Sequence, residues 1–271
     1  MAIKFKSVAV VGALLGALAL AGCGQEEKKP NHIKVGVIVG AEQQVAEVAQ
    51  KVAKEKYGLD VELVTFNDYV LPNEALSKGD LDVNAFQHKP YLDQQIKDRG
   101  YKLVAVGNSF VYPITGYSKK IKALSELQDG AQVALPNDPT NLGRSLLLLQ
   151  KVGLIKLKDN VGLLPTVLDV VENPKNLKLV ELEAPQLPRS LDDDQIALAI
   201  INTTYASQIN LTPTKDGLFV EEKDSPYVNL IVAREDNKDA DNVKKFVQAY
   251  QSDEVNDAAN KIFNGGAVKG W

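Results

Sequence analysis

The sequence predicts an α/β fold of two α/β lobes joined by two chain crossings. Three observations predict it. From residue 32 onward, strand-like runs rich in β-branched residues alternate with single amphipathic helices, a pattern typical of βαβ units. The alternation restarts near residue 131 with a new strand and a new long helix. A late apolar run, 227–236, has the composition of a strand that returns the chain to the first lobe.

The first lobe contains four strand-like runs separated by helical segments. Val45, Val48 and Val52 share one helical stripe that ends at Gly58, and a short helix that begins at Asn67 or Asp68 follows the second strand. Strands that alternate with single helices predict a parallel sheet, with ligands beyond the carboxyl ends of its strands. The expected strands are 33–39, 60–66, 81–87 and 101–107.

The second lobe repeats this order. A strand at 131–137 precedes a long helix at 138–155, and two amphipathic helices after residue 241 finish the chain. Further elements of the second lobe are expected at 176–183, 186–193 and 195–202. We therefore expect lobe I to comprise 32–112 plus 227–271, and lobe II to comprise 113–226.

Residues 1–22 have the pattern of a secretory signal peptide of the lipoprotein type. Lys4 and Lys6 precede an apolar run that is shorter than the roughly 20 residues of a membrane-spanning helix. The run ends in Leu-Ala-Gly-Cys, which matches the motif at which bacterial lipoproteins are cleaved and acylated on the cysteine. The next segment, 23–31, is short and polar and is expected to be a flexible tether.

Cys23 is the only cysteine of the chain. An internal disulfide is therefore excluded, and a cysteine beside a signal segment has no core to enter. Acylation of Cys23 is the favoured interpretation, and stable attachment takes more than one acyl chain. This predicts a lipid-anchored protein at the cell membrane that faces the periplasm or the cell exterior.

Composition and motifs argue against several other functions. The formal net charge of −4, without a basic stripe, argues against nucleic acid binding. A metal site lacks ligands, because His32 and His88 are the only histidines and the cysteine is in the lipoprotein motif. Asp192–Asp194 is expected to be a solvated loop or helix cap rather than a metal site. No G-x-S-x-G motif is present, so we expect neither catalysis nor a cofactor.

Several long segments of the sequence resemble one family of bacterial transport proteins. They include DVNAFQHKPYLDQQ (82–95), VALPNDPTNLGRSLLLLQ (133–150) and SPYVNLIVAREDN (225–237). In these motifs and in their order, the chain resembles the methionine-binding lipoproteins of methionine ABC importers, which belong to the NlpA-type family of solute-binding proteins. The resemblance implies a type II periplasmic-binding-protein-like fold. It also implies that the lobes close on L-methionine and deliver it to a membrane permease driven by its ATPase.

The resemblance implies that Arg144 and Asn141 bind the backbone of the substrate. Asp138 is expected to cap a helix that starts at Pro139, so Asn141 and Arg144 fall three residues apart on its first turns. A guanidinium can hold a carboxylate through two parallel hydrogen bonds. We expect this guanidinium to be solvated in the open cleft without ligand. An exposed arginine, or one that pairs with its neighbours, is the alternative.

Asn202 and Asn229 are the expected polar partners of the substrate. Each ends or interrupts an apolar run, where an amide is otherwise unfavourable, and both are expected near the returning crossing. An amide can accept from the ammonium through its oxygen and donate to the carboxylate through its nitrogen. A simple turn or strand-end role is the alternative.

The remaining site residues are expected to surround the substrate side chain. Phe86, His88 and Tyr91 lie where a parallel strand is expected to end, and Tyr69 joins them. Aromatic rings pack well against a thioether, although Phe86 and Tyr91 also suit a simple core role. For His88 the resemblance implies a polar wall of the pocket. A relative that binds another small amino acid or a methionine-containing dipeptide, or a surface lipoprotein without a transport role, stays an alternative for the whole chain.

Overall fold

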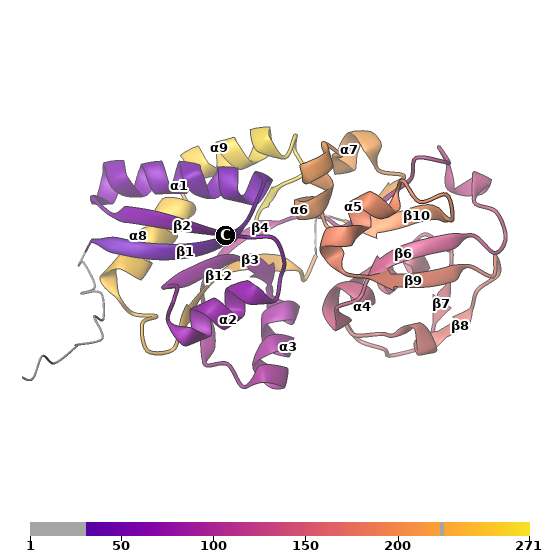
Figure 1. Ribbon diagram of the computed structural model, residues 1–271, viewed down its shortest axis with the longest axis horizontal. Coiled ribbons are helices and arrows are strands. Elements are labelled where there is room, and N and C mark those ends of the chain that lie inside the picture. Colours follow the sequence, from indigo (N-terminus) through magenta and orange to yellow (C-terminus); the bar gives the residue numbers. More distant parts are fainter. Residues whose placement is uncertain (1–30, 223–224) are drawn as a thin grey trace, which may run out of the picture.

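The chain folds into two α/β lobes that lie side by side (Figure 1). The structure, a computed structural model, describes residues 31–222 and 225–271. A six-stranded sheet forms the core of lobe I and a five-stranded sheet that of lobe II. This two-lobed α/β architecture is the predicted one. Cys23, the signal segment 1–22 and most of the tether lie outside the described residues. In the part that is described, no helix is long and apolar enough to cross a membrane.

The sheet of lobe I takes its strands from two separate parts of the chain. Its order is β13-β4-β12-β3-β1-β2. The strands are β1 (His32–Ile38), β2 (Asp60–Phe66), β3 (Val83–His88), β4 (Leu103–Val111), β12 (Val228–Arg234) and β13 (Val268–Lys269). The first three strands match the predicted runs within two residues, because their β-branched residues fill a sheet that is buried on both faces.

The sheet is mixed rather than parallel, which corrects the sequence-based expectation. β1 pairs in parallel with β2 and β3, as predicted. The returning strand β12, however, lies antiparallel between β3 and β4. A strand that arrives from the other lobe enters from the opposite end, and local alternation of helices and strands carries no information about such an insertion.

Helices cover both faces of this sheet. The first face is covered by α1 (Ala41–Tyr57), α8 (Asp241–Tyr250) and α9 (Asp253–Ile262), and the second by α2 (Leu71–Lys78) and α3 (Lys89–Arg99). Gly58 ends α1 in a left-handed conformation, as the sequence predicted. α2 begins at Leu71, later than expected, because the Asp68 carboxylate accepts hydrogen bonds from the Val70 and Leu71 amides and forms a turn before the helix.

The sheet of lobe II has the order β11-β5-β10-β6-β9. Its strands are β5 (Thr115–Tyr117), β6 (Gln132–Pro136), β9 (Lys178–Leu182), β10 (Ile196–Ile201) and β11 (Phe219–Val220), and β7 (Lys156–Leu157) with β8 (Val170–Glu172) forms a separate pair. The helices are α4 (Pro139–Lys151), α5 (Leu187–Ser190), α6 (Thr203–Ala206) and α7 (Pro213–Asp216), with 3₁₀ turns at Leu124–Glu126, Val167–Asp169, Ala184–Gln186 and Ser207–Ile209.

Two crossings connect the sheets, one between β4 and β5 and one between β11 and β12. The described strands of each sheet fall inside the ranges expected for lobes I and II. The limits of these lobes as folding units stay a prediction. One apolar cluster contains residues of both lobes, including Ile38 and Phe86 of lobe I and Tyr117 and Tyr205 of lobe II. The lobes therefore touch in this structure, which is a closed one.

Candidate ligand-binding site

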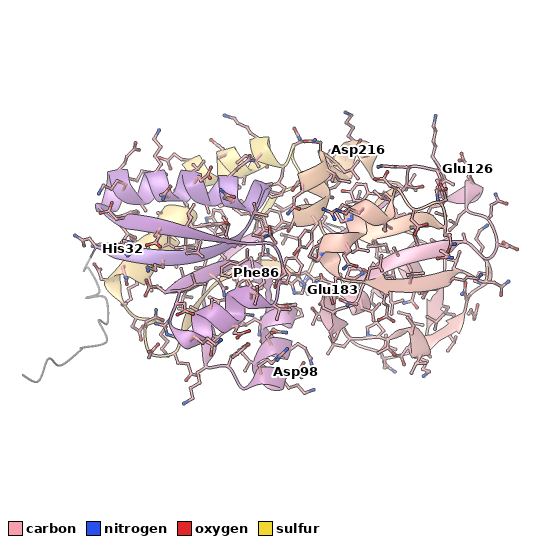
Figure 2. The ribbon with its side chains drawn as sticks, in the orientation of Figure 1. His32, Phe86, Asp98, Glu126, Glu183 and Asp216 are labelled. Carbon is pink, nitrogen blue, oxygen red and sulfur yellow. The ribbon has the colours of Figure 1, made fainter. Side chains whose placement is uncertain are left out.

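A pocket lies between the two lobes, at the carboxyl ends of parallel strands. Its volume is about 330 Å³, including the open space at its mouth. Phe86 lies at the side of lobe I that faces lobe II (Figure 2). All eight residues proposed as substrate contacts line this pocket: Tyr69, Phe86, His88, Tyr91, Asn141, Arg144, Asn202 and Asn229. Their placement together is a structural fact, whereas their role in binding stays a prediction.

The lobe I side of the pocket is aromatic. The ring centroids of Tyr69, Phe86 and Tyr91 are 5.8 to 6.1 Å apart. Tyr205 of lobe II joins them, with its ring 5.0 Å from that of Tyr69. The Tyr91 hydroxyl donates to the Tyr69 carbonyl at 2.9 Å, which fixes the two rings relative to each other. Such a cluster gives a rigid apolar wall.

His88 ends β3 and caps α3. Its Nδ1 accepts a hydrogen bond from the Tyr91 amide at 3.1 Å, so the ring proton resides on Nε2. Nε2 then donates to Asn141 Oδ1 of lobe II at 3.2 Å. Burial and the neighbouring Arg144 charge lower the pKa of His88 to about 3. His88 is therefore a neutral wall of the pocket and a hydrogen-bond bridge between the lobes.

Asn141 holds the polar side of the pocket in one arrangement. Its Oδ1 accepts from both His88 and Asn202 Nδ2, the latter at 2.8 Å. Its Nδ2 donates to Asp138 Oδ2 at 2.9 Å, while Asp138 Oδ1 caps α4, as the sequence predicted. The Asn141 oxygen is thus fully used within the protein.

The Asn202 oxygen, by contrast, is buried without a hydrogen-bond partner among the described residues. Its own amide nitrogen is fixed on Asn141, so the oxygen has a defined direction. Asn229 Nδ2 donates to the Phe86 carbonyl at 2.9 Å, with Asn229 opposite His88 in the β12–β3 register. Thr203, the neighbour of Asn202, donates to the Pro113 carbonyl, so Asn202 lies close to the first crossing.

Arg144 is buried and paired in this closed structure, whereas the expectation of a solvated guanidinium concerns the open cleft and stays a prediction. Its side chain is 3% exposed. Nε donates to Glu221 Oε1 at 2.8 Å, Nη2 donates to Glu221 Oε2, and Nη2 also donates to the Tyr112 carbonyl at 3.0 Å. Its Cζ lies 4.4 Å from the centre of the Tyr227 ring.

The pairing changes what Arg144 can offer a ligand. One edge of the guanidinium, Nε and Nη2, is occupied by Glu221. Nη1 is the one guanidinium nitrogen that has no acceptor among residues 31–222 and 225–271. An anion in the pocket would accept a hydrogen bond from Nη1. It would not receive the predicted two parallel hydrogen bonds from the guanidinium unless Glu221 moved.

Four further residues line the pocket, and sequence reasoning missed them: Gln87, Tyr112, Thr203 and Thr204. Thr203 and Thr204 come just after β10. Ligands of α/β folds lie beyond the carboxyl ends of the strands, so the argument that selected Asn202 could also have selected these two threonines. Gln87 is anchored by Asn73 and Asn84, two other buried amides, at 2.6 and 3.0 Å. No sequence pattern around Glu221 indicated that it would pair with Arg144.

The described residues contain no group of three His, Cys, Asp or Glu side chains that could hold a metal ion. His32 lies at the end of lobe I that is far from Phe86 (Figure 2), so it does not reach the pocket that His88 lines.

The chain was compared with known families and structures. The family model described as NlpA lipoprotein matches residues 33–271. D-methionine-binding lipoprotein MetQ of Escherichia coli K12 is 88% identical over 271 residues, all of both chains. A crystal structure of the methionine-binding protein MetQ is 90% identical, with a TM-score of 0.89 over 90% of this chain and 99% of that one. A Burkholderia cenocepacia nutrient-binding protein bound to methionine is 54% identical, with a TM-score of 0.86 over 88% of this chain and all of that one.

A family match from residue 33 to the last residue, and near-complete overlap with these relatives, leave one assignment: the chain belongs to the NlpA lipoprotein family.

Proposed function

We propose that the protein binds methionine in the pocket between its lobes and delivers it to the permease of an ABC importer. One observation carries the proposal. The pocket joins an aromatic wall from lobe I to a polar wall, mostly from lobe II, whose free donor and free acceptor match the two charged groups of an amino acid. Binding at this interface stabilises the closed arrangement of the lobes, the form that a permease can distinguish from the open one.

The polar wall suits the backbone of a free amino acid. Arg144 Nη1 donates to the carboxylate, because it is the guanidinium nitrogen that Glu221 and Tyr112 leave open. The buried Asn202 oxygen accepts from the ammonium, which supplies the partner it lacks in the protein. His88, being neutral, does not repel the ammonium.

The aromatic wall of the pocket suits the methionine side chain. A thioether contacts aromatic rings favourably, and Tyr69, Phe86 and Tyr91 present three of them.

The relatives support this assignment. The Escherichia coli relative is named for D-methionine and a solved relative holds methionine. The family resemblance implied L-methionine, and the sequence does not distinguish the enantiomers, so both belong in the test. Attachment to the membrane through acylated Cys23, an extracytoplasmic position and partnership with a permease and its ATPase complete the proposal. Binding without catalysis is part of it, because the names of these relatives describe binding proteins.

Calorimetric titration of unliganded protein tests the proposal. We expect L-methionine or D-methionine, or both, to bind more tightly than alanine, glutamate, arginine or glycyl-methionine. Phe86→Leu is expected to weaken methionine binding, since it removes a ring from the wall. The matched control, Phe246→Leu, alters a buried phenylalanine in a core cluster of lobe I that does not contain Phe86, and it should leave the affinity unchanged. Tight binding of arginine or glutamate with no response to either methionine would reject the assignment.

A further inference from the structure

A segment of lobe II that begins with α6 rests on lobe I beside the pocket. Thr204 Oγ1 donates to Glu42 Oε1, and Gln208 Nε2 donates to the Val39 carbonyl at 3.0 Å. Glu42 is the second residue of α1, just beyond the carboxyl end of β1. These hydrogen bonds join residues more than 160 positions apart and connect lobe II to lobe I in this closed arrangement.

The same segment makes a third contact with the loop after β2. The Tyr205 hydroxyl donates to the Asn67 carbonyl at 3.3 Å, and the Tyr205 ring packs on Tyr69. Thr204 itself lines the pocket. A ligand that fills the pocket and this interlobe contact are therefore parts of one closed arrangement.

Glu42 is an unusual component of such an interface. Glu42 is 1% exposed. Its second carboxyl oxygen, Oε2, is buried without a hydrogen-bond partner among the described residues. An ionised carboxylate with an unpartnered buried oxygen is strongly unfavourable, whereas a neutral carboxyl group tolerates the same position far better.

The titratable groups that face Glu42 do not supply a compensating charge. They are four tyrosines from four places: Tyr69 after β2, Tyr112 at the first crossing, Tyr205 in α6 and Tyr250 in α8. Burial raises the pKa of each of these phenols, so all four are neutral at physiological pH. Burial likewise raises the pKa of Glu42 from 4.5 to about 8, against an opposing effect of the Thr204 hydrogen bond.

We propose that Glu42 is a proton-operated latch between the lobes: it is protonated in the closed molecule and ionises when the lobes separate. Opening breaks the Thr204 contact and brings water to the carboxyl group, so each closing event takes up one proton at neutral pH. The coupling of this proton to ligand rests on the proposed function, because methionine is the ligand expected to close the lobes.

The sign of the pH effect follows from the two states. The closed state has the raised pKa, so closing is favoured at low pH and becomes progressively less favourable between about pH 5 and pH 8. The limit is about tenfold in apparent affinity per pH unit, the effect of one proton. His88 acts in the opposite direction below its usual pKa of 6.5, because its pKa falls on burial, so pH 7.5 isolates Glu42.

Infrared spectroscopy of the full-length protein tests the latch without relying on ligand affinity. At pH 7, the wild-type minus Glu42→Gln difference spectrum should show the carbonyl stretch of a protonated carboxyl group with methionine, and the bands of an ionised carboxylate without it. Glu47→Gln changes an exposed glutamate of the same helix and should leave this band in place. Bands of an ionised carboxylate for Glu42, both without and with methionine, would overturn the proposal.

Calorimetry then measures the coupling. At pH 7.5, in buffers of different ionisation enthalpy, methionine binding should take up about 0.8 proton in wild type and in Glu47→Gln. In Glu42→Gln, whose amide keeps the shape and the Thr204 bond, the uptake should fall to near zero. Equal uptake in wild type and Glu42→Gln would reject the latch. Absence of any methionine binding would reject the proposed function instead. The infrared spectrum at pH 6, where closing is favoured without ligand and an ordinary glutamate is ionised, would then decide the latch by showing Glu42 protonated or not.

Discussion

Arg144 of α4 and Glu221, which follows β11, form a buried ion pair across 77 residues of sequence. Arg144 Nε lies 2.8 Å from Glu221 Oε1, and Ile114 at the first crossing also donates its amide to Glu221 at 3.4 Å. The pair therefore ties α4 to both chain crossings. It gives Arg144 a structural role next to its proposed role in binding, and experiments can separate the two.

Arg144→Ala should destabilise the unliganded protein. The substitution leaves Glu221, 13% exposed, without its counter-ion. Breaking a buried pair at one partner costs about 3–5 kcal/mol, far more than the 0.5 kcal/mol typical of a surface change. Urea unfolding of both proteins without ligand checks this. An unchanged midpoint would show that the pair does not stabilise the fold.

The double variant Arg144→Met with Glu221→Gln should separate stability from binding. It removes both charges and keeps the volumes close, so much of the lost unfolding free energy should return. Methionine affinity should stay reduced, because Nη1 is gone. We expect a loss of about 2–5 kcal/mol in binding, at least thirty-fold, by calorimetry. Wild-type affinity in the double variant would remove Arg144 from the binding site.

His88 should make the protein less stable in mild acid. Its folded pKa is lowered to about 3, below the ordinary 6.5, so the unfolded chain binds the extra proton as the pH falls. The stability contribution is therefore complete above pH 6.5 and is lost progressively toward pH 3, by up to about 2 kcal/mol at pH 5. His88→Asn keeps a helix cap without a titrating ring. Between pH 7.5 and pH 5, urea unfolding should show wild type losing up to about 2 kcal/mol relative to this variant, because the Glu42 contribution, which has the opposite sign, is common to both.

The aromatic wall predicts how affinity depends on the side chain of the amino acid. Methionine extends beyond alanine by two carbons and a sulfur, and each buried methylene is worth about 0.8 kcal/mol. Methionine should therefore bind more tightly than alanine by about 2 kcal/mol, roughly thirty-fold. Norleucine replaces the sulfur by a methylene and loses the sulfur–ring contacts, worth about 0.3–1.5 kcal/mol, so it should not bind more tightly than methionine. Equal binding of alanine and methionine by calorimetry would exclude a side-chain pocket at Tyr69, Phe86 and Tyr91.

Cys23→Ala should abolish lipid attachment. The substitution removes the thiol that the lipoprotein motif predicts to be acylated, and it leaves an unprocessed precursor that still carries its apolar segment. Metabolic labelling with a radioactive fatty acid checks the outcome, with wild type as the positive control. Label that persists on the variant would refute acylation at Cys23.

The sequence by itself determined the elements and most of the pocket. The helix that starts at Pro139 was readable from Asp138, and Gly58 and Gly79 mark helix ends, because caps depend on contacts only a few residues apart. The family motifs then named eight side chains that all line one pocket. Motifs preserve the residues around a site even where local patterns are silent about their purpose.

Tertiary structure alone decided the pairings between distant segments. The antiparallel insertion of β12 between β3 and β4, the ion pair of Arg144 with Glu221 and the burial of Glu42 against Thr204 each join residues more than 70 positions apart. Glutamates at 42, 47 and 221 look alike in the sequence. Only the folded chain fixes which of them loses its water, because desolvation depends on what packs around a carboxyl group rather than on what precedes it.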